Sequence, residues 1–418
     1  MPYTLLRGQF VIRYDDLPRQ GPEPDGDTVK FMPDTPGFVE VLPRRSGSPP
    51  ALNARGISVR LEAIDALETH FEETHQELSG ANAARGRLLD GLGFTNIKYY
   101  DDLPNKVESV DRSRLPGYVL SNGIDANGRM IGFVYSGMPS AADGASVFLD
   151  NAGVDGSENA KLLASGLVYP AFYATLPASL REHLAESSRR ARAAKAGIWA
   201  RSTADPNGKA TIVDLAALEE LVIWPKLFRR IVPYLAAGNT TFDGFGAWLR
   251  ADPVHRDDRL LLLSPIESGN MHDVVAAGGN QIQLTRWPED FVIEPDPPAS
   301  GTTTGRRRYT AGDVVIVAAV PDPVGADLDH ESASLLNVTP AEIDLQGWNF
   351  TDRAGHQETL SGLIAGGDIR RITLAGGLAL GNSGGSLTLT DGSGNTIDHV
   401  SYAEAEVKPG RTLVFARS

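Results

Sequence analysis

Short runs of alternating apolar and polar residues occupy much of the first 136 residues and return after Val314. This period of two is typical of β-strands, and the Gly, Asn and Asp residues between the runs supply turns. In the first part of the chain, strands are expected at 9–14, 28–32, 57–64, 118–121 and 129–135. The pattern therefore predicts a mainly β protein with a smaller number of helices.

A helical period is clearest between residues 179 and 199. Apolar residues such as Leu180, Leu184 and Ala191 recur there on one face, while the arginines lie mostly on the other. A shorter helix is expected near 81–92, where it interrupts the strands. Helices therefore accompany the strands of the first 200 residues.

Two turn-rich stretches, 201–208 and 295–305, divide the chain. The region between them shows a helical pattern over 210–250, with breaks expected at Pro225 and Pro233. A strand or two is expected after it, at 260–263 and 281–284. After residue 312 the pattern is all β, with the short strand spacing of a sandwich. The predicted domains are residues 1–201 with strands and helices, 205–298 mostly helical, and 312–418 all β.

The amino-acid composition excludes several kinds of functional site. Of the 418 residues, 41% are hydrophobic and 22% are charged, which is the balance of a globular protein. The chain has no cysteine, which excludes disulfides, thiolate metal sites and cysteine nucleophiles. The net charge is −14, and more than half of this acidic excess lies in residues 312–418. That segment is therefore a poor candidate for binding phosphate.

The chain shows no apolar run as long as a membrane span. Its first residues lack a charged leader followed by an apolar stretch, the pattern of a signal peptide. These features predict a protein without a membrane partner and with a cytoplasmic location.

Charged residues collect where predicted strands meet turns. Asp27 precedes one strand, Arg60 lies on another, and Asp65 and Glu68 follow the end of that strand. Arg129 begins a further strand, directly after a two-residue hairpin signal. Carboxylates suit Ca²⁺ or Mg²⁺, guanidinium groups suit phosphate, and a spare carboxylate can activate water. Together these side chains predict phosphodiester hydrolysis.

These residues belong to a wider resemblance. Residues 8–201 resemble the thermonuclease family, whose staphylococcal-nuclease-like domain is built on an OB-type barrel. The motifs that carry the resemblance, in family order, are 25–30, 60–68, 127–135, 165–169 and 185–199. One departure is Leu67, which stands where the family usually has proline.

The resemblance implies a Ca²⁺ site. Asp27 and Asp65 would ligate the ion through their side chains and Ala66 through its carbonyl, with Mg²⁺ and Mn²⁺ as alternative ions. Glu68 matches the family's water-activating glutamate. Asp25 is less defined, because it either caps its own turn or supports this site.

The resemblance also implies how a substrate is held. Arg60 and Arg129 match the pair that binds the scissile phosphate and stabilises its pentacoordinate state. Phe172 and Tyr173 would lie near the nucleotide, where stacking tolerates any base. The implied function is a sugar-non-specific nuclease that takes DNA and RNA without base specificity and leaves 3′ phosphates.

Residues 312–418 resemble the lamin tail domain, an immunoglobulin-like β-sandwich. The segments that carry this resemblance are 315–319, 323–327, 343–352, 380–385 and 391–402. Members of that family bind or position other molecules and have no catalytic residues to transfer. The resemblance therefore implies a protein partner, or self-association, through this domain.

Other interpretations stay open at this point. Charged residues at strand ends often form surface ion pairs, and packing explains Phe172 and Tyr173 better than stacking does. The barrel could be a catalytically silent nucleic-acid-binding scaffold. It could also be a nuclease held inactive by the inserts 35–56 and 137–158, by the middle region or by the acidic tail until a trigger releases it.

Overall fold

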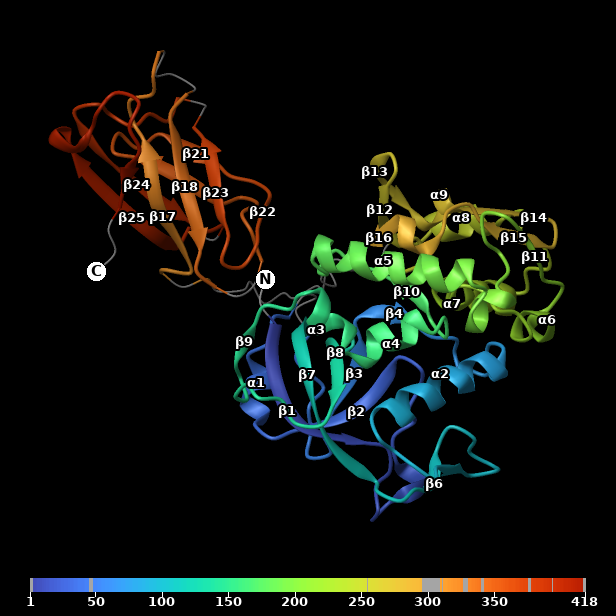
Figure 1. Ribbon diagram of the computed structural model, residues 1–418. Helices are drawn as coiled ribbons and strands as arrows, with labels where there is room; N and C mark the ends of the chain where they lie inside the picture. Colours follow the sequence, from blue (N-terminus) through green and yellow to red (C-terminus); the bar gives the residue numbers. More distant parts are fainter. Residues whose placement is uncertain are drawn as a thin grey trace. The chain divides into compact units, whose positions relative to one another are not determined.

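The computed structural model divides the chain into two compact units, Met1–Ser300 and Gly301–Ser418 (Figure 1). The residues that it describes are 3–44, 48–253, 255–294, 309, 311–325, 330–339, 342–374, 377–392 and 394–415. The predicted linker 295–305 lies outside them. The first unit contains both the strand-rich region that begins the chain and the middle region, so these two are parts of one body.

The first unit begins with a closed barrel of five strands. These strands are β1 (Tyr3–Val11), β2 (Thr28–Pro33), β3 (Ile57–Leu61), β7 (Arg114–Ile124) and β8 (Met130–Ser136). Neighbours pair in the order β2-β3-β8-β7-β1, and β1 closes the barrel by pairing with β2. Only the β3–β8 pair is parallel. The structure thus has an OB-like barrel, as the sequence predicts.

Short strands and helices surround the barrel. The strands are β4 (Ala63–Asp65), β5 (Lys98–Tyr99), β6 (Val107–Ser109), β9 (Ser146–Val147) and β10 (Tyr169–Ala171). The helices are α1 (Pro36–Glu40), α2 (Leu78–Gly91), α3 (Asn151–Asp155), α4 (Glu158–Ala164) and α5 (Ala178–Ala193). Helix α5 buries Leu180, Leu184 and Ala191, the face that the sequence predicts.

The middle region is mixed rather than mostly helical. Its helices are α6 (Leu215–Glu219), α7 (Pro225–Ala236), α8 (Phe245–Arg250) and α9 (Met271–Val274). Its strands are β11 (Ala210–Thr211), β12 (Arg259–Leu263), β13 (Ile266–Asn270), β14 (Val275–Gly278), β15 (Gln281–Leu284) and β16 (Phe291–Ile293). The strands form two three-stranded sheets. Helical periodicity ends near residue 250, and short apolar runs form strands after it.

The two prolines of α7 also differ from expectation. Pro225 does not break the helix but begins it, at a position where a missing N–H costs nothing. Pro233 lies inside the helix, which continues to Ala236. The apolar face of α7 is buried, and this packing sustains a helix that local propensity alone would end early.

One hydrophobic core joins the middle region to the barrel region. Trp224 and Phe291 pack edge to face, with ring centroids 5.4 Å apart, and Tyr169 and Trp199 do the same at 5.0 Å. All four side chains belong to a single buried cluster, which also contains Leu67 from the loop after β4. The middle region is therefore packed onto the barrel region, not attached by a linker.

The second unit consists of antiparallel sheets. One contains β17 (Val314–Val320), β18 (Ser332–Asn337), β23 (Ile369–Thr373) and β26 (Leu413–Val414). The other contains β20 (Asn349–Asp352), β21 (Gln357–Thr359), β24 (Gly384–Thr390) and β25 (Thr396–Ala403). A small third sheet pairs β19 (Ile343–Asp344) with β22 (Leu363–Ile364).

Both large sheets of the second unit contribute to one core, and Trp348 lies inside it. This arrangement is compatible with an immunoglobulin-like sandwich. Among the residues that the structure describes in either unit, every helix is too short or too polar to cross a bilayer.

Candidate active site

A pocket of about 400 Å³ lies in the first unit, beside the barrel. Its lining includes all five charged side chains that the sequence singled out: Asp27, Arg60, Asp65, Glu68 and Arg129. The chain separates these residues by as many as 102 positions, and the fold brings them to one cavity. Convergence of this kind is what a functional site requires and what scattered surface ion pairs would not produce.

The barrel strands place the two arginines. Strand β3 pairs with β2 so that Arg60 lies opposite Thr28, the residue after Asp27. Val59 and Leu61 point into the barrel core, so Arg60 points out of it. Strand β8 runs parallel to β3 and begins directly after Arg129. The closed barrel thus holds both guanidinium groups on adjacent strands.

A turn between β3 and β4 places the acidic residues. Ala63 has a φ of +71°, a conformation that non-glycine residues seldom adopt. This turn takes the chain out of the barrel and into β4, which pairs with β10. Asp65 ends that strand, and Glu68 follows three residues later. The strained residue therefore lies where the chain is redirected toward the pocket.

Each arginine has one polar partner that fixes its orientation. Arg60 Nη2 donates to the Tyr173 hydroxyl at 2.9 Å, and its guanidinium lies 4.5 Å from the centre of the Tyr173 ring. Arg129 Nε donates to Asp125 Oδ2 at 2.8 Å. Burial alone would raise the pKa of Tyr173, but the charges of Arg60 and Lys226 outweigh it and hold that pKa below its usual value.

The carboxylates are crowded: Asp65 is buried, and Asp25, Asp27 and Glu68 are partly buried. Burial, together with the charge of Asp65, raises the pKa of Asp27. Burial raises the pKa of Glu68 to about 7, helped by Asp27 and Asp65 and opposed by Arg229. The pKa of Asp25 lies well above its usual value because Asp25 is partly buried and faces Asp27 and Glu68. The site thus holds concentrated negative charge, which favours a cation nearby.

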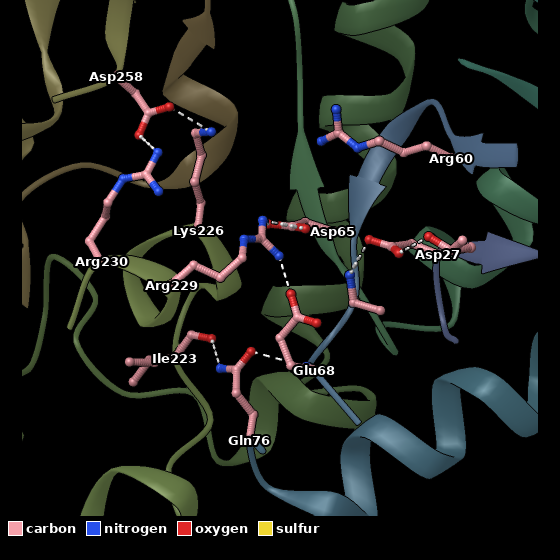
Figure 2. A network of polar contacts seen from close by, with 12 residues as sticks. Asp27, Arg60, Asp65, Glu68, Gln76, Ile223, Lys226, Arg229, Arg230 and Asp258 are labelled. Carbon is pink, nitrogen blue, oxygen red and sulfur yellow. Dashed lines mark hydrogen bonds and ion pairs between the residues drawn. The ribbon is translucent and has the colours of Figure 1, made fainter. Parts of the chain in front are cut away.

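Arg229, which the sequence does not predict as a site residue, supplies a cation beside these acids. Arg229 Nη2 donates to both oxygens of Asp65, at 3.0 and 2.9 Å, and Nη1 donates to Glu68 Oε1. Figure 2 shows this side chain extending from α7 to the two acids. No motif points to it, because it lies in the region that resembles no family and 161 residues beyond Glu68.

Other polar contacts connect the same two segments. The backbone N–H of Glu68 donates to Gln76 Oε1 at 3.1 Å, and Gln76 Nε2 donates to the Ile223 carbonyl at 3.0 Å (Figure 2). Gln76 is fully buried. This bridge fixes the loop that carries Glu68 to the residues just before α7.

The donors expected for a metal ion are already engaged. Both oxygens of Asp65 accept hydrogen bonds from Arg229. Asp27 Oδ2 accepts from the Ala66 N–H at 3.2 Å, and Oδ1 accepts from the Thr28 hydroxyl at 3.1 Å. Within the described residues, no three or more His, Asp or Glu side chains are arranged to hold a metal ion. The residues as placed do not fit the expected Ca²⁺.

The two predicted stacking residues have different environments. Tyr173 lines the pocket and contacts Arg60. Phe172 is 0% exposed and belongs to the hydrophobic core of the barrel region. Their strand-like alternation places one side chain toward the pocket and the other away from it. Phe172 therefore has a packing role, and only Tyr173 is placed to meet a ligand.

Comparison with protein-family models and with curated proteins gives no match to this chain. The thermonuclease and lamin-tail resemblances therefore stay predictions from the sequence motifs. The closed OB-like barrel and the sheets of the second unit are compatible with them.

Proposed function

We propose that the first unit is a nuclease that hydrolyses phosphodiester bonds in DNA and RNA. The observation that carries the proposal is the convergence of Arg60, Arg129 and Glu68 on one pocket, with Asp27 and Asp65 beside them. Two guanidinium groups can bind a phosphate through paired hydrogen bonds, and a partly buried carboxylate can accept a proton from water.

The proposed reaction uses groups of the protein. Glu68 accepts a proton from water as the water oxygen bonds to phosphorus. The bond from phosphorus to the 5′ oxygen breaks on the opposite side, and that oxygen takes a proton from solvent. Arg60 and Arg129 stabilise the negative charge that builds on the phosphate oxygens. The product then carries a 3′ phosphate, as the resemblance implies.

Substrate binding is expected to depend on local charge, because the chain as a whole carries a net charge of −14. The cationic side chains that line the pocket are Arg60, Arg129, Lys226 and Arg229. Arg60 and Arg129 are expected to contact phosphate rather than base edges, while Lys226 and Arg229 are paired with acidic side chains. Contacts to phosphate give binding without base specificity and with strong salt dependence. Tyr173 adds a ring on which any base can stack.

The proposal is tested by incubating the full chain with single-stranded DNA, plasmid and RNA, each with calcium, magnesium or a chelator. Cleavage of DNA and RNA with 3′-phosphate products is the expected result. An Arg60→Ala protein purified in parallel controls for contaminating nucleases. Equal cleavage by both preparations would contradict the proposal, because the activity would then not depend on Arg60 of this pocket.

A second candidate is a nucleic-acid-binding scaffold without catalysis. The observation that favours it is the engagement of Glu68 by Arg229, which stabilises the charged carboxylate but also occupies one of its oxygens. The same assay separates the two. Retention of DNA in a binding assay, without cleavage in any buffer, supports the scaffold and rejects the nuclease.

The pKa of Glu68 gives a prediction for the pH dependence. The base acts when deprotonated, so at a pKa of about 7 the rate is expected to rise with pH and level off above pH 7. Below that value the rate falls about tenfold per pH unit. Initial rates measured in chelator across this range check the prediction. A profile that is flat through pH 7 would exclude Glu68 as the base.

For the second unit we propose a role in binding, either of a protein partner or of a second copy of the chain. The support is its predicted resemblance to a family without catalytic residues and its all-β architecture.

A further inference from the structure

We infer that Arg229 is a resident cation of this pocket: it takes the place that the family resemblance gives to Ca²⁺, and the site works without a divalent ion. This inference rests on the proposed function for its catalytic part. Its structural part concerns Arg229, Asp65 and Glu68 alone.

The contacts of Arg229 show how a guanidinium can stand in for a metal ion at these two acids. One guanidinium spans the two acids to which the resemblance assigns the metal and the attacking water. Asp65 directs both oxygens to it, so a metal at Asp65 would share those oxygens with a guanidinium and be repelled by its positive charge. A guanidinium carries its charge at any pH at which proteins fold, and no chelator removes it.

The helix that carries Arg229 cannot be withdrawn as a lid. Trp224, Leu227, Phe228 and Ile231 are each 0% exposed. They pack in the cluster that also contains Tyr169 of the barrel region. Moving α7 away from the pocket would expose this core to water, at a large cost in free energy. Helix α7 therefore stays beside the pocket, and Arg229 could leave Asp65 only through a change in its own side-chain conformation.

The three cationic side chains of α7 have different acidic partners. Lys226 Nζ and Arg230 Nη2 contact the two oxygens of buried Asp258, at 2.6 and 2.8 Å. Arg229, which lies between them in sequence, turns instead to Asp65 and Glu68 (Figure 2). Asp258 thus pairs with both neighbouring cations and offsets one of their two charges, while Arg229 offsets the acids of the pocket.

This arrangement leaves the other arginines for the substrate. Arg229 acts through Asp65 and Glu68 as a positioning residue, since it holds the base and compensates its crowded negative charge. Arg60 and Arg129 keep donors for the phosphate, because the polar contact of each uses only part of its guanidinium.

The test compares three full-length proteins: wild type, Arg229→Gln and Arg230→Gln. Arg230 is the matched control, because it lies on the same helix and contacts Asp258 outside the pocket lining. Single-stranded DNA cleavage is measured in chelator and in calcium or manganese. Binding of CaCl₂ and MnCl₂ is measured by calorimetry without DNA. Thermal unfolding shows whether each variant is folded, and Arg229→Met, which is also uncharged, replaces Arg229→Gln if the latter is not.

Wild type and Arg230→Gln are expected to cleave equally well with and without chelator and to bind neither ion. Arg229→Gln is expected to lose about 10- to 100-fold of the rate in chelator, as the loss of an orienting group typically does. It is also expected to gain ion binding at the freed Asp65, with part of the rate restored by the ion. A purely structural role would not produce this switch in ion dependence.

The opposite pattern would overturn the inference. If wild type is inactive in chelator, and Arg229→Gln binds the ion more tightly and cleaves faster than wild type, Arg229 is an inhibitory plug that a metal displaces. If no protein cleaves under any condition, the proposed function fails. Calorimetry then still decides the structural part, since a variant that gains no ion binding shows that Arg229 does not stand in a metal's place.

Discussion

Replacing Arg60 with alanine is expected to lower kcat/KM on single-stranded DNA by about 10²- to 10³-fold, the typical cost of removing one preorganised donor to a transition-state oxyanion. Arg60 lies on β3 of the closed barrel, so no neighbouring side chain can take over its position. Its burial makes its charge act through a poorly screened environment, where each contact to phosphate is strengthened.

Two variants separate this effect from indirect ones. Tyr173→Phe removes only the hydroxyl that accepts from Arg60, and the expected loss is a factor of about 2 to 10. Arg55→Ala removes a surface arginine paired with Asp16 and is expected to leave kcat/KM unchanged. An Arg60→Ala protein as active as Arg55→Ala would remove Arg60 from the mechanism.

Replacing Trp224 with alanine is expected to destabilise the first unit by about 3 to 5 kcal/mol. Trp224 is 0% exposed and packs edge to face on Phe291, in the core that the barrel region and the middle region share. The surrounding side chains come from several elements and cannot all close the cavity. The first unit's unfolding transition in urea, followed by tryptophan fluorescence and circular dichroism, measures the change.

Phe148→Ala is the control for this experiment. Phe148 is 82% exposed, so the free energy of unfolding is expected to change by less than about 0.5 kcal/mol. A similarly small change for Trp224→Ala would show that Trp224 does not stabilise the shared core. The shared core also means that a fragment ending at residue 201 exposes Tyr169 and Trp199, so its activity would not report on inhibition by the middle region.

The sequence was sufficient for the parts of the site that follow local rules. Strand alternation places Arg60 outward from the barrel, and short motifs bring Asp65 and Glu68 to the end of that strand. The barrel order and the compatible sheets of the second unit agree with the predicted architecture. These features depend on neighbouring residues or on motifs read in order.

Long-range packing accounts for what the sequence did not predict. Arg229 reaches the acids only because α7 packs on the barrel region, and nothing in its own segment signals that contact. The apolar runs at 260–263 and 281–284 do predict strands, as observed, but they do not predict the two three-stranded sheets that these strands join. Phe172 and Tyr173 are adjacent, and only the register of the chain at β10 decides which of them faces the pocket.

The bridge through Gln76 has a consequence for how such chains can diversify. Gln76 joins the Glu68 backbone to Ile223, so the position of the Glu68 carboxylate depends on both the barrel region and the middle region. Recombination that exchanged either segment alone would misplace that group even if both halves were well formed. The two segments are therefore expected to be inherited together.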